Sequence, residues 1–173
     1  DNVDDLSKEF ESGDIVKIKG QIQTYQNRKQ LIVHKIEKSD DASLKSEDFL
    51  IQSSVNPLDL FAELLGYVKS MKNDHLRQLC LDVIEDPELK PMILRAPAAK
   101  SIHHAWVGGL IEHILSITKI MDFMAKHYSF LNRDFLIFGA IFHDIGKIWE
   151  LSYDQSFSYT DRGRLIGHME MGC

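Results

Sequence analysis

The sequence has 173 residues, enough for one domain or for one domain with part of a second. Hydrophobic residues make up 44% and charged residues 27%, which suits a soluble globular protein and excludes collagen-like, disordered and membrane-embedded classes. The formal net charge of −6 argues against a protein that coats duplex DNA by bulk attraction. The first residues do not read as a signal peptide, and two cysteines, Cys80 and Cys173, do not suggest a disulfide framework. We therefore expect a cytoplasmic protein without membrane partners.

The first predicted elements with a clear pattern are two β-strands, over residues 15–25 and 30–38, joined by a polar turn. In the first strand, apolar residues alternate with polar ones around Gly20, which predicts one buried face and a bend or bulge at the glycine. In the second strand, simple alternation places Leu31 on one face and Ile36 on the other. Because two strands alone are not stable in water, we expect the chain to begin inside a small β domain.

The same segment is locally basic, with six lysines and arginines against the single acid Glu37. A stripe of this kind can follow the phosphates of a single nucleic-acid strand even when the total charge is negative. The alternative interpretation is an ordinary solvated sheet face. The basic residues are Lys17, Lys19, Arg28, Lys29, Lys35 and Lys38.

After a polar linker over residues 39–56, the pattern becomes helical. Pro57 suits the first turn of a helix, and Asn56 can cap it. We therefore expect a mainly α fold with a β segment at its start. Helices are predicted over residues 57–68, 74–84, 104–127 and 133–151, between Pro87 and Pro91, around Leu6–Phe10 and from Leu165 onward, with a polar loop over residues 153–164.

Histidines are the most informative residues in the helical part. His113 lies in a mostly apolar helix, and the pair His143-Asp144 follows the most hydrophobic segment of the chain. Ionisable groups in such surroundings are unfavourable unless something compensates them, and a divalent metal does so by pairing the carboxylate and accepting imidazole lone pairs. The alternative is a buried histidine bonded to a backbone carbonyl.

Three separate elements supply these candidate ligands. His113 and His143 are 30 residues apart, which suits two antiparallel helices that face each other across a bundle. His168 follows a loop and could approach from a third element. Lys147 lies just beyond Asp144 and could bind a phosphate, although a solvated lysine near a helix end is the alternative.

Together these motifs resemble the HD-domain superfamily of metal-dependent phosphohydrolases, because His113 is followed by HDIGK at residues 143–147. The segment SIHHAWVGGLIEH at residues 101–113 is similar to the HHA-x-x-GGL-x-EH segment of the YhaM-type 3′→5′ exoribonucleases. The segment YTDRGRLIGH at residues 159–168 is similar to the loop and helix after the dyad in the same family.

The resemblance implies an OB-fold ahead of an HD-domain helical bundle. Residues 1–38 would be the C-terminal part of the OB-fold, residues 39–56 a linker, and residues 57–173 an HD domain. The first OB strands are not found in the sequence, so this part would be a truncated remnant. No residue up to Cys173 matches the closing aspartate ligand of the family, so the HD domain would be incomplete at its C-terminus.

The resemblance also implies roles for individual residues. His113, His143 and Asp144 would hold a first metal ion, with Asp144 bridging to a second ion that His168 serves. Asp144 and Lys147 would take part in catalysis, and Lys147 would bind a phosphate oxygen. The ion would be manganese, with iron, cobalt or zinc as alternatives, and one or two ions would be bound. Substrate contacts would come from His103, His104, Lys17, Lys19, Arg28 and Lys29.

The implied activity is a 3′→5′ exoribonuclease that acts on single-stranded RNA. Single-stranded DNA as a substrate and the oligomeric state stay open. A nucleotide or cyclic-nucleotide phosphohydrolase is the alternative enzyme, because the HD residues do not distinguish the two. A different class is a non-catalytic nucleic-acid-binding protein on an HD scaffold. Structural roles for His103 and His104, such as capping the following helix, also stay open.

Overall fold

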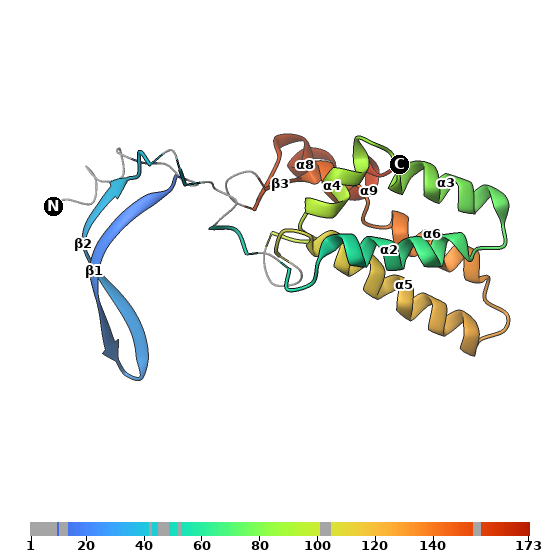
Figure 1. The fold of residues 1–173 in the computed structure, drawn as a ribbon, viewed down its shortest axis with the longest axis horizontal. Helices are drawn as coiled ribbons and strands as arrows, with labels where there is room; N and C mark the ends of the chain where they lie inside the picture. Colours follow the sequence, from blue (N-terminus) through green and yellow to red (C-terminus); the bar gives the residue numbers. More distant parts are fainter. Residues whose placement is uncertain are drawn as a thin grey trace. The chain divides into compact units, whose positions relative to one another are not determined.

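A computed structural model describes residues 10, 14–41, 43–44, 49–51, 53–100, 105–153 and 157–173. The chain divides into two compact units, Asp1–Phe49 and Leu50–Cys173 (Figure 1). The first contains a β-hairpin and the second is mainly helical. The helix predicted around Leu6–Phe10 falls almost wholly outside the described residues. No helix in the described part of the chain is long and apolar enough to cross a membrane.

The hairpin consists of β1 (Val16–Tyr25) and β2 (Arg28–Lys38), paired antiparallel. The turn is only two residues long, and both Gln26 and Asn27 have positive φ, at 48° and 60°. Positive φ at both positions gives the turn the twist that antiparallel strands require. The two predicted strands are thus confirmed, with a turn shorter than the polar sequence suggests.

A β-bulge interrupts the register at Gly20. Lys19 pairs with Lys35, whereas Gly20 pairs with Val33, so that His34 is an extra residue in β2. A Cβ at Gly20 would overlap the carbonyl oxygen of Ile32, which explains why glycine is needed there. The predicted bulge is therefore confirmed.

The bulge also corrects one expectation from simple alternation. Ile36 pairs with Ile18, and Leu31 pairs with Ile22 on the same side of β1. Ile36 and Leu31 therefore share a face instead of lying on opposite faces, because the extra residue shifts the alternation by one.

As a result, the hairpin has one apolar and one polar face, which we define by the pairing register. Lys29 pairs with Thr24 and Lys38 pairs with Val16, so these two lysines lie on the apolar face, apart from Lys17, Lys19, Arg28 and Lys35. The apolar face carries Val16, Ile18, Ile22, Leu31, Val33 and Ile36. The polar face carries Lys17, Lys19, Gln21, Gln23, Tyr25, Arg28, Gln30, Ile32, Lys35 and Glu37.

The helical unit is built around α5, which packs against α6 and α2 (Figure 1). Its core is formed mainly by aliphatic side chains, among them Leu64, Leu110, Ile114, Ile137 and Ile141. This confirms the predicted mainly α class. The helices are α2 (Pro57–Lys69), α3 (Asp74–Ile84), α4 (Leu89–Arg95), α5 (Gly109–His127), α6 (Arg133–Phe142), α7 (Lys147–Glu150), α8 (Asp161–Ile166) and α9 (His168–Met171).

Side-chain caps explain where several helices begin. Asn56 Oδ1 accepts from the backbone N of Leu58, and Pro57 occupies the first turn as predicted. Asn73 caps α3 and Asn132 caps α6 in the same manner.

Two helix starts differ from the sequence prediction. Pro91 lies inside α4 instead of ending it, because the first turn of a helix needs no backbone N–H donor at that position. The helix predicted from residue 104 begins at Gly109, and Gly108 adopts a φ of 81° just before it. A left-handed residue cannot continue a right-handed helix, so α5 starts after it.

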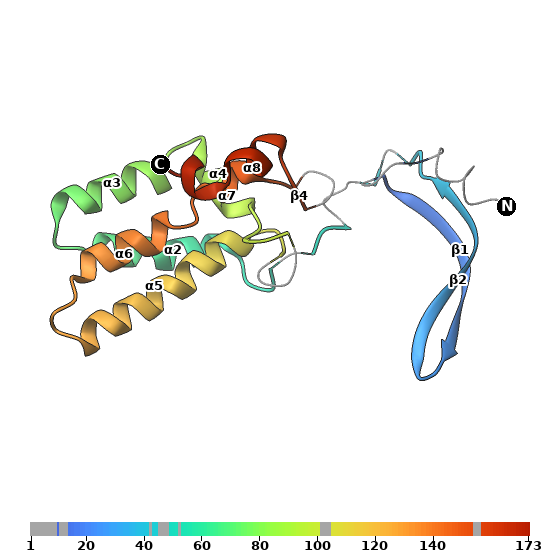
Figure 2. The ribbon, with the colours of Figure 1, turned by 180° about the vertical axis from the view of Figure 1, so that it is seen from behind.

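The C-terminal part is more regular than the polar loop that the sequence suggests. The two-residue strands β3 (Leu151–Ser152) and β4 (Ser158–Tyr159) pair antiparallel. The following helix begins at Asp161 rather than at Leu165, and Gly167, at φ 82°, separates α8 from α9. Figure 2 shows α4, α7 and α8 gathered at one end of the helical unit.

Candidate metal centre

His113 is presented by the second turn of α5. Its neighbours Leu110, Ile111 and Ile114 are fully or almost fully buried and fix this helix against the core. His113 itself lies at the edge of the buried stripe, with 26% of its side chain exposed. The imidazole is therefore held rigidly by a packed helix while its ring remains accessible.

His143 and Asp144 lie where the predicted helix over residues 133–151 breaks. After α6 ends at Phe142, backbone N–H groups bond three residues back, from Lys147 to Asp144 and from Ile148 to Ile145. Such a tightened turn often marks a functional position within a helix. It allows both side chains of the dyad to face His113.

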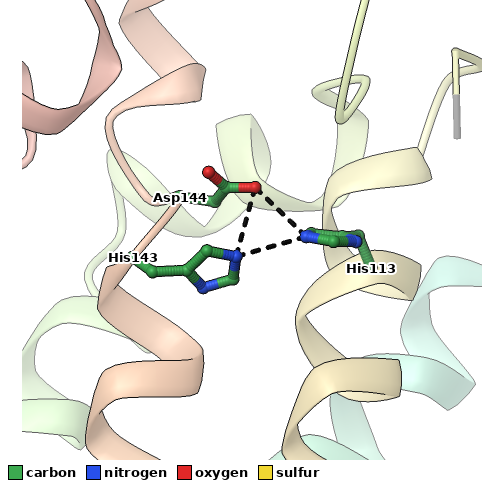
Figure 3. A group of neighbouring side chains, drawn as sticks. All are labelled: His113, His143 and Asp144. Carbon is green, nitrogen blue, oxygen red and sulfur yellow. Dashed lines mark hydrogen bonds and ion pairs between the residues drawn. The ribbon is translucent and has the colours of Figure 1, made fainter. Parts of the chain in front are cut away.

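Three ligand atoms meet at one point (Figure 3). His113 Nε2 lies 3.2 Å from His143 Nε2 and 3.2 Å from Asp144 Oδ2, and His143 Nε2 lies 3.3 Å from the same oxygen. Atoms that bind one divalent ion at about 2.1 Å lie roughly 3.0–3.5 Å apart, so the spacing fits a shared cation. Two imidazole nitrogens and one carboxylate oxygen are also a chemically suitable donor set.

The hydrogen bonds behind His143 favour its role as a nitrogen donor. His143 Nδ1 donates to the carbonyl oxygen of Ala140 at 3.0 Å, which leaves the lone pair on Nε2. When Nε2 is protonated as well, the ring donates from it to Asp144, and this hydrogen bond is the chief cause that raises the pKa of His143 above its ordinary value.

Asp144 is the most strongly perturbed carboxyl group of the site, and only 8% of its side chain is exposed. Burial acts to raise the pKa of the carboxyl, but hydrogen bonds from His113, His143 and Lys147 outweigh it and hold the pKa well below its usual range. Lys147 Nζ lies 2.7 Å from Asp144 Oδ2. The carboxylate is therefore ionised and surrounded by donors.

His168 approaches the other oxygen of the same carboxylate. His168 Nε2 lies 3.3 Å from Asp144 Oδ1. On its far side, Nδ1 lies 3.0 Å from each carboxylate oxygen of Glu150. The structure thus brings His113, His143, His168 and Asp144 together from three segments of the helical unit.

The remaining predicted site residues are placed elsewhere or are not described. His103 and His104 lie outside the described residues. Lys17, Lys19, Arg28 and Lys29 belong to the hairpin unit, on the faces given above. Sequence reasoning missed Glu150, which accepts a hydrogen bond from His168 of the site, and Glu112, the chain neighbour of His113, which accepts from Trp106 and Ser53. The only sequence signal for Glu150 was an acid in an otherwise apolar stretch.

The cluster lies within a segment that matches a known protein family. The HD domain family matches residues 110–173, which include all four histidine and aspartate side chains of the cluster. Residues 110–173 form an HD domain. An HD domain implies a divalent metal, and the cluster of His113, His143 and Asp144 could bind one.

Similarity to curated proteins extends over nearly the whole HD-domain chain. This chain is 32% identical over 163 residues to the 3′-5′ exoribonuclease YhaM of Halalkalibacterium halodurans, and the alignment covers 94% of this chain and 50% of the relative. The proteins of the same name from Listeria innocua and Bacillus subtilis are 33% and 32% identical over 158 residues. The chain spans about half the length of these relatives. No solved structure gives a significant match.

The resemblance to YhaM-type HD-domain proteins is therefore confirmed. The assignment of the hairpin to an OB-fold and the roles of single residues stay predictions.

Proposed function

We propose that this HD-domain protein is a metal-dependent phosphodiester hydrolase that acts as a 3′→5′ exoribonuclease on single-stranded RNA. The observation that carries the proposal is the convergence of His113, His143 and Asp144 within 3.3 Å of one another. The similarity to proteins named 3′-5′ exoribonuclease YhaM, which extends along 91–95% of the chain, supports the same proposal.

In this proposal, His113 Nε2, His143 Nε2 and Asp144 Oδ2 hold one divalent ion, with manganese as the preferred candidate and iron, cobalt or zinc as alternatives. Such an ion lowers the pKa of bound water and neutralises charge on the phosphoryl group. The chain's own contribution is to fix the two imidazoles and the carboxylate on packed elements. Asp144 Oδ1 and His168 Nε2 face each other and form part of the site for a second ion.

Lys147 is proposed to bind a non-bridging phosphate oxygen. Its side chain is 16% exposed, and its ammonium group contacts the same Asp144 oxygen as the two histidines. A partly buried cation beside the reacting group stabilises charge that develops on the phosphate. Asp144 and Lys147 are thus the proposed catalytic residues.

The hairpin is proposed to bind the RNA strand. Lys17, Lys19 and Arg28 share the polar face with Tyr25, which combines phosphate attraction with a ring for stacking. Lys29, on the apolar face, does not belong to this surface. His103 and His104 are proposed substrate contacts on the resemblance alone.

The proposed domain boundaries remain residues 1–38 for an OB-fold part, 39–56 for the linker and 57–173 for the HD domain. The division between Phe49 and Leu50 falls within that linker. A cytoplasmic location is proposed, in keeping with an RNA substrate.

The test is elemental analysis of metal bound to the full-length protein, together with a manganese-supplemented assay on labelled single-stranded RNA. Bound metal with stepwise release of nucleotides from the 3′ end supports the proposal. Bound metal without RNA cleavage, but with hydrolysis of nucleotides or cyclic nucleotides, replaces it with a small-molecule phosphohydrolase. RNA binding with neither metal nor cleavage leaves a non-catalytic binding protein.

A further inference from the structure

Glu150, the last residue of α7, is a buried acid to which the proposed chemistry gives no role. It is 8% exposed, and no lysine or arginine among the described residues pairs with it. A buried carboxylate without a cation or hydrogen-bond donors is strongly destabilising. Its partner is His168, which contacts it three times.

The three contacts fix both the backbone and the ring of His168. The backbone N–H of His168 donates to Glu150 Oε1 at 3.1 Å. Ring atom Nδ1 lies 3.0 Å from both Oε1 and Oε2, so the ring donates into the carboxylate whichever oxygen it favours. Because Nδ1 carries the proton that is donated in the hydrogen bond to Glu150, the lone pair of a neutral His168 is on Nε2.

That lone pair faces Asp144 Oδ1 at 3.3 Å, which is a contact between two acceptors. Such a contact is favourable only when a cation or a proton lies between the two atoms. His143 is oriented by the neutral carbonyl of Ala140, whereas His168 is oriented by a full negative charge. A carboxylate behind a histidine raises the basicity of the nitrogen that faces a metal.

The backbone of Glu150 makes contacts of its own, so a substitution of the side chain tests the contact with His168 alone. The carbonyl oxygen of Glu150 accepts from the backbone N–H of Thr160 at 2.9 Å and lies against Gly163. These contacts hold the start of α8 whatever the side chain at position 150 is.

We propose that Glu150 is the positioning residue of the second metal ion: it holds His168 so that Nε2, together with Asp144 Oδ1, binds that ion. This inference rests on the proposed metal-dependent function. It concerns the occupancy of the second site and not the nature of the substrate.

The experiment is a titration of the metal-free full-length protein with Mn²⁺ in a calorimeter, for wild type and Glu150→Gln. The amide preserves size but removes the charge and can turn its own donor toward His168. We expect two ions in wild type, and in the variant an unchanged first ion with the second bound about 10–100-fold more weakly. Glu170→Gln is the matched control, because it removes an exposed charge two residues from His168, and it should bind both ions as wild type does.

The outcomes separate this inference from the proposed function. No bound metal in wild type overturns the function and the inference together. One ion in wild type, or two ions with equal affinity in Glu150→Gln, overturns the inference alone. A double variant, Glu150→Gln with His168→Ala, should weaken the second ion no more than His168→Ala does, because the two residues act as one unit.

A spectroscopic measurement covers the case in which Glu150→Gln does not fold. In the wild-type protein loaded with diamagnetic Zn²⁺, long-range ¹H–¹⁵N spectra of histidine rings report which nitrogen carries the proton. A proton on Nδ1 of His168 supports the inference, and a proton on Nε2 overturns it.

Discussion

Gly146 lies directly against the backbone carbonyl of His168, so that a Cβ at position 146 would overlap that oxygen and crowd the N–H of Gly172. We therefore expect Gly146→Ala to push α9 away from the dyad. The free energy of unfolding should fall by about 1–3 kcal/mol, and binding of a second metal ion should weaken. Chemical denaturation and calorimetric titration measure the two effects.

Gly139 provides the control, because a Cβ there meets nothing within 4 Å and the residue lies inside α6. Gly139→Ala should stabilise the protein by up to ~1 kcal/mol through the better helix propensity of alanine. Equal behaviour of the two variants would contradict the close approach at Gly146.

His143→Ala should remove the first metal ion while leaving the fold intact. The side chain is 39% exposed and lies after the last residue of α6, so we expect a change in unfolding free energy below about 1 kcal/mol. Asp144→Ala should likewise abolish RNA hydrolysis. Elemental analysis and a 3′-end cleavage assay measure both, with His127→Ala as an exposed histidine control. Wild-type turnover of His143→Ala at matched metal occupancy would show that the residue is not a ligand.

Lys147→Met should retain metal but lose rate. The methionine fills the partly buried volume while removing the ammonium group beside Asp144, and loss of one such charge at a reacting phosphate lowers kcat by roughly 10²–10³-fold. Lys69→Met, at an exposed position in the last turn of α2, is the control. A large increase in KM with unchanged kcat would instead assign Lys147 to substrate binding alone.

The two faces of the hairpin should differ in their effect on RNA. Lys19→Ala combined with Lys35→Ala removes two facing cations from the polar face, whereas Lys29→Ala removes one from the apolar face. We expect the first change to weaken binding of single-stranded RNA and to reduce the salt slope of log K by about 0.7 for each lost phosphate contact. Lys29→Ala should leave the slope unchanged. An equal loss from both faces would rule out a single RNA-binding face.

Asp122 should make folding stability depend on pH. Its side chain is 7% exposed, and Arg133 Nε and Lys126 Nζ each lie 2.6 Å from it. Burial acts to raise the pKa of Asp122, but the bonds to Lys126 and Arg133 lower it below the ordinary value of 3.8. A carboxyl whose pKa is lower in the folded state stabilises the protein above about pH 4, and this contribution is lost as pH falls through the folded pKa.

Asp122→Asn should therefore destabilise the protein by about 1–3 kcal/mol at pH 7. The difference from wild type should shrink below pH 4. Urea unfolding at pH 7, 5 and 3 tests both statements. A difference that is the same at all three values would mean that the effect comes from packing and not from charge.

Local signals in the sequence were sufficient for much of the fold. Asn56-Pro57 predicted the start of α2, and Gly20 predicted the position of the β-bulge, whose extra residue lies opposite it in β2. The apolar pattern did not reveal the break after Phe142, because the tightened turn keeps nearly helical backbone angles and the same buried side chains. The partner of Glu150 was equally hidden, since His168 is distant in sequence and reaches it only through the turn at Gly167.

The convergence of His113, His143 and Asp144 was predicted by spacing and resemblance together. Which oxygen of Asp144 faces which histidine depends on side-chain geometry that no spacing encodes. The assignment of the hairpin to an OB-fold stays a prediction, because the described part of the first unit shows only two strands.

The short helix α7 fixes how far the carboxylate of Glu150 lies along the chain from that of Asp144 in the candidate metal centre. Asp144 and Glu150 stand six positions apart, and the four residues Lys147–Glu150 complete this path. Removing one residue from it would rotate Glu150 by about 100° around the helix axis while the His143-Asp144 turn stayed in place. Under the proposed two-ion site, such a deletion should leave the first ion bound and weaken the second, without altering any proposed ligand.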